Sequence, residues 1–129
     1  MSYHKIEFWD KSGRLKLGND AHFFYTAIAP FSDTEALVKV GISSIPYQRL
    51  VAIHCNSPFK IELAAFAWVG SRRDAARIEK AVLAMFAEYK TRGEWLKLPT
   101  EGETKSKFSA ACRRQVEEVT GKDVKWQRV

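Results

Sequence analysis

The stretch EALVKVGISSIPYQRL, residues 35–50, joins an apolar run to a segment that begins with a proline. The apolar run predicts a β-strand, and Pro46 suits the first turn of a helix. Lys39 interrupts the strand, Gly41 follows it, and Arg49 lies eight residues further on, in the predicted helix. One interpretation is an ordinary strand-to-helix connection. The other is that Gly41 leaves space beside a phosphate while Lys39 and Arg49 supply positive charge around it.

The segments around this stretch predict further strands. AHFFYTAIA, closed by Pro30, is a strand that a short polar link separates from residues 36–43, so we expect an antiparallel pair. Residues 59–69 return to a strand pattern, and residues 5–20 alternate around a Lys-Ser-Gly turn, as in a hairpin. Residues 94–98 and 123–129 allow two more short extended segments.

Helical patterns lie between these strands. The first helix runs to about Cys55 and has two alternative apolar stripes. Ser71 and Asp74 have the spacing of a capping box, which predicts the start of a long helix that Gly93 ends. Its expected core-facing stripe consists of Ile78, Val82, Met85, Phe86 and Tyr89. The expected apolar positions of a last helix, which Gly121 ends, are Phe108, Cys112, Val116 and Val119.

This order of elements predicts an α+β fold with a small antiparallel β-sheet flanked by helices, an N-terminal hairpin and a C-terminal helix. The length of 129 residues suits a single domain. The net charge of +6 favours a polyanionic partner, with nucleic acid first. Because no apolar segment is long enough to span a membrane and no signal-peptide pattern is present, we expect a cytoplasmic protein without a membrane partner, and a monomer. Cys55 and Cys112 are expected to be buried thiols.

Several motifs stand in one order along residues 22–98. They are FFY at 23–25, KVG at 39–41, Arg49, CNSPFKIEL at 55–63, ARIEKAVLAMF at 76–86 and RGEWLKL at 92–98. In this order the chain resembles the GIY-YIG nuclease superfamily, in its phage and bacterial branch with a Lys-Ile/Val-Gly second motif. Each motif is short and unspecific by itself, so the resemblance rests on their number and order.

The resemblance implies a GIY-YIG-like nuclease core over residues 21–98, an N-terminal hairpin extension over residues 1–20 and a C-terminal helical extension over residues 99–129. It also implies a metal-dependent endonuclease of a phage or mobile element, with double-stranded DNA as the expected substrate. Glu79 would be the metal ligand, for Mg²⁺ or Mn²⁺, with water and phosphate oxygens completing the coordination. The expected catalytic residues are Tyr25, Lys39, Arg49, His54 and Glu79.

The chemistry of phosphodiester hydrolysis suits these residue types. Arg49 can hold a phosphate through two N–H donors, and His54 is a candidate proton carrier. Lys39 departs from the full second motif, which carries a tyrosine at this position. Lys39 could act as a base only if burial or nearby cations favour its neutral amine. Otherwise it stabilises negative charge, and the base is Tyr25, His54 or bulk hydroxide.

Structural roles compete with these assignments. Lys39 could protect an edge strand from aggregation, Tyr25 and Trp95 could be core aromatics, and His54 could close a helix end. Three functions therefore stay open: a nuclease, a catalytically degenerate GIY-YIG-fold module that binds nucleic acid without cutting it, and a protein-interaction domain.

Overall fold

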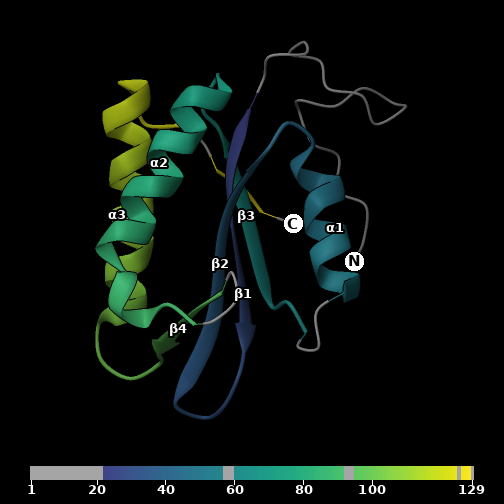
Figure 1. Ribbon diagram of the computed structural model, residues 1–129, viewed down its shortest axis with the longest axis vertical. Helices are drawn as coiled ribbons and strands as arrows, with labels where there is room; N and C mark the ends of the chain where they lie inside the picture. Colours follow the sequence, from purple (N-terminus) through teal and green to yellow (C-terminus); the bar gives the residue numbers. More distant parts are fainter. Residues whose placement is uncertain (1–21, 57–59, 92–94, 125, 129) are drawn as a thin grey trace.

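The computed structural model describes residues 22–56, 60–91, 95–124 and 126–128 (Figure 1). It is an α+β fold with an antiparallel sheet and flanking helices, which confirms the predicted fold class. The predicted hairpin of residues 5–20 lies outside the described residues. The elements are β1 (Phe23–Pro30), β2 (Glu35–Ser43), α1 (Pro46–Asn56), β3 (Leu63–Trp68), α2 (Arg72–Met85), the 3-10 helix η1 (Ala87–Tyr89), β4 (Leu96–Pro99), α3 (Thr104–Thr120) and β5 (Trp126–Arg128).

The described strands form one sheet in the order β4-β2-β1-β3-β5, and every neighbouring pair is antiparallel. The expected pair of β1 and β2 therefore forms, and it lies near the centre of the sheet. β4 pairs with residues 35–38 of β2 only. Among the described residues, positions 39–43 of β2 have no strand on that side, and we call this stretch the open half of β2.

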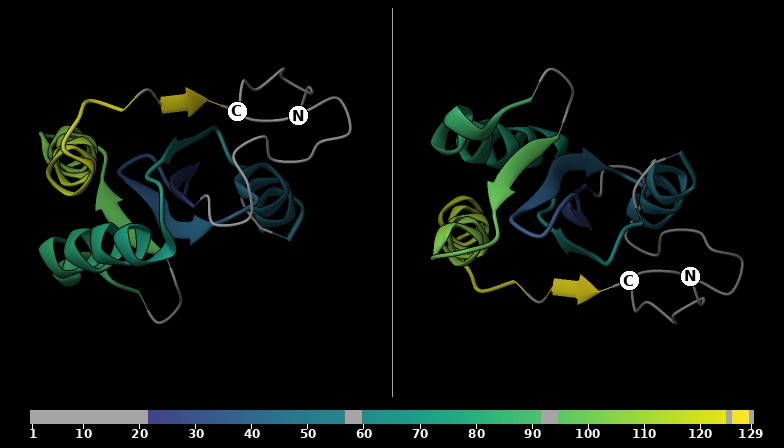
Figure 2. Two further views of the ribbon diagram at one scale, coloured as in Figure 1. Left: turned by 90° about the horizontal axis from the view of Figure 1, so that it is seen from above. Right: turned by 90° about the horizontal axis from the view of Figure 1, so that it is seen from below.

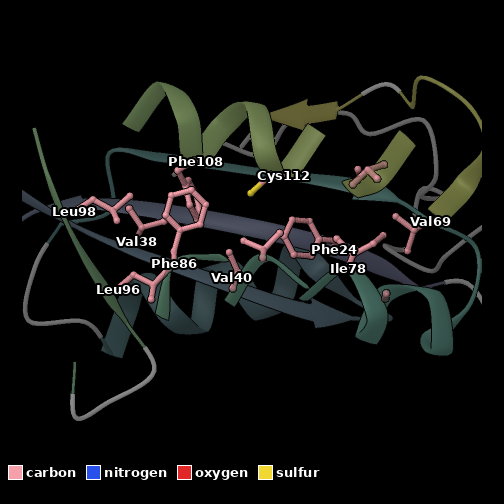
Figure 3. Close-up of a cluster of buried hydrophobic side chains, with 14 residues drawn as sticks. Phe24, Val38, Val40, Val69, Ile78, Phe86, Leu96, Leu98, Phe108 and Cys112 are labelled. Carbon is pink, nitrogen blue, oxygen red and sulfur yellow. The ribbon is translucent and has the colours of Figure 1, made fainter. Parts of the chain in front are cut away.

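The helices form two layers around the sheet, with α2 and α3 on one face and α1 on the other (Figures 1 and 2). Alternate residues of each strand point to opposite faces. Phe24, Val38 and Val40 face α2 and α3, and Figure 3 shows them in a buried apolar cluster with Ile78 and Phe108. The opposite face carries a smaller buried cluster: Phe23, Tyr25, Ala27, Tyr47, Leu50, Ile53, Ala64 and Phe66.

The start of α2 follows the sequence prediction, but its end does not. Ser71 is the N-cap residue, and its hydroxyl accepts a hydrogen bond from the Asp74 backbone N–H at 3.2 Å. The helix ends at Met85 instead of continuing to Gly93, because the backbone of Phe86 leaves the helical region and a 3-10 turn follows. Met85 is 49% exposed, so the prediction that it belongs to the core is wrong.

The last helix packs into the same core as the rest of the domain. Phe108, Cys112 and Val116 of α3 are buried, and Gly121 ends the helix in a left-handed conformation, as predicted. Burial raises the pKa of the Cys112 thiol to about 12. Cys55 is exposed, in contrast to the prediction, because it lies in the last turn of α1 on the side away from Leu50.

None of the described helices is both long and apolar enough to cross a membrane.

Candidate active site

The register of β1 and β2 brings the first candidate residues together. Tyr25 is opposite Gly41 and Ala27 is opposite Lys39, so Tyr25 and Lys39 lie on the same face of the sheet, on adjacent strands. Such diagonal neighbours have Cβ atoms roughly 7 Å apart, which is within reach of long side chains. The Tyr25 side chain is only 2% exposed and belongs to the cluster under α1.

Gly41 has a different role from the one that its sequence suggests. A Cβ atom at this position would clash with the Tyr25 ring and hydroxyl, so the ring occupies the space above the glycine. The interpretation that Gly41 leaves empty space for a phosphate is therefore wrong, because the Tyr25 ring fills that space. The glycine makes room for Tyr25, because directly opposed residues of an antiparallel pair are too close for a ring and a further side chain in this arrangement.

Lys39 is the one charged side chain that is buried in the described part of the chain, at 7% exposure. Its Nζ atom lies 5.9 Å from the centroid of the Trp95 ring. Sequence reasoning treated Trp95 as a core residue and missed this contact. The pairing of Val38 with Leu96 places Trp95 next to Lys39, and only the register of β2 and β4 reveals it. Burial of a cation is unfavourable without compensating contacts, and the Trp95 ring supplies one such contact.

The two candidates on α1 lie on different flanks of the helix. The inward face of α1 consists of Pro46, Tyr47, Leu50 and Ile53. Arg49 is exposed and lies beside the Ile53 flank, whereas His54 is half-buried and lies beside the Tyr47 flank. Two residues that are five positions apart in an α-helix point in directions about 140° apart around the helix axis. One ligand therefore cannot readily contact both Arg49 and His54. Within the described residues the Nδ1 atom of His54 is buried without a hydrogen-bond partner.

Glu79 comes from the other layer. It follows the fully buried Ile78 in α2 and is half-buried, as expected for a residue at the margin of the apolar stripe. α2 and α1 cover opposite faces of the sheet (Figure 2), so the helix that contains Glu79 and the helix that contains Arg49 lie in different layers. α2 packs on β2 and β1. A site that uses both residues must therefore form around the edge of the sheet, and the open half of β2 is the edge nearest to Lys39.

The described residues contain no group of three or more His, Cys, Asp or Glu side chains that could hold a metal ion. A site for zinc, which takes three or four protein ligands, is therefore not formed by this part of the chain. A single carboxylate such as Glu79 still suits Mg²⁺, since this ion commonly uses one or two carboxylates and completes its shell with water and phosphate oxygens.

The fold and the candidate site define a small α+β domain that presents a buried lysine and a tyrosine on one face of an antiparallel sheet. The chain belongs to the T5orf172 domain family, whose model matches residues 22–120. This match includes α3, which packs on α2 in the same core. No curated protein and no solved structure matches the chain.

Proposed function

We propose that this protein is a metal-dependent endonuclease that hydrolyses phosphodiester bonds of double-stranded DNA. The observation that carries the proposal is the burial of Lys39 on the same face as Tyr25. A buried cation beside a hydroxyl group suits the binding of an anion such as a phosphate. Membership of the T5orf172 family, a phage-associated domain found in some nuclease-like proteins, supports this choice, as does the order of the GIY-YIG-like motifs.

We place the reaction at the open half of β2, residues 39–43. Lys39 and Tyr25 approach this edge from the face under α1. Arg49 projects from the exposed side of α1, and Glu79 extends from α2 in the other layer. Because β4 stops at the position of Val38, no described strand blocks the passage between the two layers. A DNA backbone that lies along this edge could contact cationic groups from one layer and the carboxylate from the other.

The residues divide the chemistry between them. Arg49 would hold a phosphate through two N–H donors, and Lys39 would stabilise the negative charge that grows on the phosphoryl oxygens. The Tyr25 hydroxyl lies over Gly41, where it could orient the attacking water. Because Lys39 acts here as a cation, it cannot accept the proton of that water, which would pass through the Tyr25 hydroxyl or directly to bulk hydroxide. We do not assign this step to His54, because it lies on the flank of α1 away from Arg49.

Glu79 would hold the divalent ion, either Mg²⁺ or Mn²⁺, through its carboxylate. When bound, such an ion polarises the phosphoryl group and stabilises the charge of the leaving oxygen. The protein would supply this ion with one half-buried carboxylate, at the margin of the apolar stripe of α2.

Cleavage of supercoiled plasmid DNA in the presence of Mg²⁺ or Mn²⁺ tests the proposal. We expect the wild-type protein to nick the plasmid and Glu79→Ala to abolish nicking without a change in the melting temperature. Glu88→Ala, which removes an exposed carboxylate from η1, is the matched control and should keep wild-type activity. Unchanged nicking by Glu79→Ala would remove this residue from the site.

A binding module without cleavage activity is the second candidate. Lys39 stands where nucleases with the full second motif carry a tyrosine, and this departure favours the binding module. The placement of Glu79 and Arg49 on helices that cover opposite faces of the sheet favours it as well. If the wild-type protein does not nick DNA but binds it with an affinity that falls as salt rises, this candidate replaces the nuclease.

A further inference from the structure

Two arginines occupy a position that is unfavourable for the local stability of α2. Arg72 and Arg73 are exposed in the first turn of the helix. The N-terminus of a helix carries a partial positive charge, so acidic residues stabilise this turn and cations oppose it. A sequence that breaks such a local rule commonly does so for a functional reason.

The surroundings of these arginines do not compensate for their charge. Within the described ranges neither Arg72 nor Arg73 has an ion-pair partner. Asp74 is the acidic residue of this turn, and its carboxylate lies 3.8 Å from the guanidinium group of Arg77 instead. Both side chains are exposed, so a ligand in solution can reach their charges.

A third cation reaches the same end of the molecule from α3. The Nζ atom of Lys122, just after the end of α3, lies 5.4 Å from the centroid of the Trp68 ring. Trp68 is the last residue of β3 and precedes Arg72 by only a few residues. Figure 1 shows the start of α2 and the end of α3 together at the top of the molecule. We call Arg72, Arg73 and Lys122 the basic end.

The opposite end of the sheet has a different charge pattern. It contains the β1–β2 turn, the start of β3, η1 and the connection from β4 to α3, at the bottom of Figure 1. The carboxylates of these segments are Asp33, Glu35, Glu62, Glu88, Glu101 and Glu103. Lysines are mixed with them, so this end does not share the positive excess of the chain. An extended polyanion would therefore favour the basic end.

The basic end is also close to the proposed site. Phe23 of β1 pairs with Trp68 on one side and with Ser43 on the other. Ser43 ends β2 two residues after Gly41, so the end of β3 and the open half of β2 meet at the same end of the sheet. A DNA backbone bound by the basic end would thus pass beside Gly41 and Tyr25.

We propose that the basic end binds the phosphate backbone of duplex DNA and guides one strand to the open half of β2. This inference rests on the proposed function and adds the surface that positions the substrate. Arginine suits the role because its planar group can donate two hydrogen bonds to one phosphate. Contacts of this kind carry no sequence information, so they would position any duplex equally.

Binding of a fluorescent 20-base-pair DNA duplex, measured by anisotropy over a series of NaCl concentrations without divalent metal, tests the inference. The variant carries Arg72→Gln, Arg73→Gln and Lys122→Gln. The matched control carries Lys60→Gln, Lys105→Gln and Lys107→Gln, which remove the same charge from the opposite end. We expect the variant to bind at least about tenfold more weakly than wild type and to lower the slope of log K against log [NaCl] by about 2.7, since each lost phosphate contact contributes about 0.9.

The control should lose much less affinity and keep a slope near that of wild type. Since Lys122→Gln also removes the contact with Trp68, a double variant with only Arg72→Gln and Arg73→Gln is measured as well; it should lower the slope by about 1.8. Equal losses in the variant and the control would overturn the inference, because bulk charge would then explain binding. If wild type nicks plasmid but the double variant binds like wild type, the inference alone fails. If wild type neither binds nor nicks DNA, both the inference and the proposed function fail.

Discussion

The two faces of the sheet differ in chemistry, although the same strands build both. The face under α2 and α3 is covered by a large cluster without a buried charged group, which includes Phe24, Val38 and Leu98. The face under α1 has a smaller cluster that contains Tyr25 and Tyr47, with the buried Lys39 beside it. Alternation along each strand thus places the larger apolar core on one face and most of the residues of the proposed site on the other.

This separation implies that stability and activity can be changed independently. A substitution at an even-numbered position of β1 or β2 should act on folding alone, whereas one at Tyr25, Lys39 or Gly41 should also act on the proposed site. Glu79 would be the exception in the proposed site, since it belongs to α2 in the apolar layer. Substitutions on the two faces test this separation, and the largest expected effect comes first.

Phe24→Ala should have the largest effect, and only on folding. Phe24 is fully buried and packs edge-on against Trp126, with ring centroids 6.0 Å apart. The cavity left by the ring should lower the free energy of unfolding by about 3–5 kcal/mol, measured by urea denaturation. Phe31→Ala, at an exposed position, should cost less than about 1 kcal/mol. A large loss of nicking activity per folded Phe24→Ala molecule would contradict the separation of the two faces.

Lys39→Met should have the converse effect. Methionine is close to lysine in volume but removes the buried charge, so the free energy of unfolding should stay within about 1 kcal/mol of wild type or rise. The nicking rate should fall by about 100-fold, since a charge that stabilises the transition state is lost. Parallel measurement of nicking and thermal melting decides between the roles. A lower melting temperature with an unchanged nicking rate would instead identify Lys39 as a structural residue of the sheet.

Gly41→Ala should affect both stability and activity, because its Cβ atom would displace the Tyr25 ring. We expect a loss of about 1–3 kcal/mol in the free energy of unfolding and about a tenfold loss in nicking rate. A double-mutant cycle gives the control. In a Tyr25→Ala background the same glycine substitution should cost less than about 0.5 kcal/mol, since the clash is gone. Equal costs in both backgrounds would show that the ring does not determine the need for glycine.

Cys112→Ala should change the slope of the alkaline limb of the stability curve. The pKa of this thiol is raised by burial from 9.0 to about 12 in the folded protein. Above pH 9 the unfolded chain therefore loses this proton while the folded chain keeps it, and stability falls as the pH rises. Removal of the thiol should make this fall shallower by up to about 1.4 kcal/mol per pH unit between pH 9 and 11, measured by urea denaturation. Cys55→Ala should keep the wild-type slope, and a matching change in that variant would refute the assignment.

Sequence patterns predicted the order and type of the elements well, because apolar spacing and end signals act locally. The Ser71 cap and the Gly121 stop are such signals. The spacing of Phe86 and Tyr89 was misleading, since a 3-10 turn places residues three apart on one side and so extends an apolar stripe without an α-helix. This is why the predicted end of α2 lay too far along the chain.

The candidate site was predictable as a set of residues and not as an arrangement. Alternation along β1 and β2 placed Tyr25 and Lys39 correctly on their strands, but the contact of Lys39 with Trp95 depends on the register between distant segments. Periodicity shows which side of α1 or α2 faces inward. It does not show which face of the sheet each helix covers, so the separation of Arg49 from Glu79 could not be inferred from the sequence.

The short outer strands have a consequence for solubility. β4 and β5 contain four and three residues, and β4 carries Lys97 and Pro99, so neither offers a long template for the strand of another molecule. Within the part of the chain that the structure describes, residues 39–43 of β2 are the stretch without a neighbouring strand on that side. Addition of a second copy at that stretch would enclose the Lys39 charge still further, which disfavours fibre-like association. Lys39, for which we propose a contact with phosphate, would thus also help to keep concentrated protein dispersed.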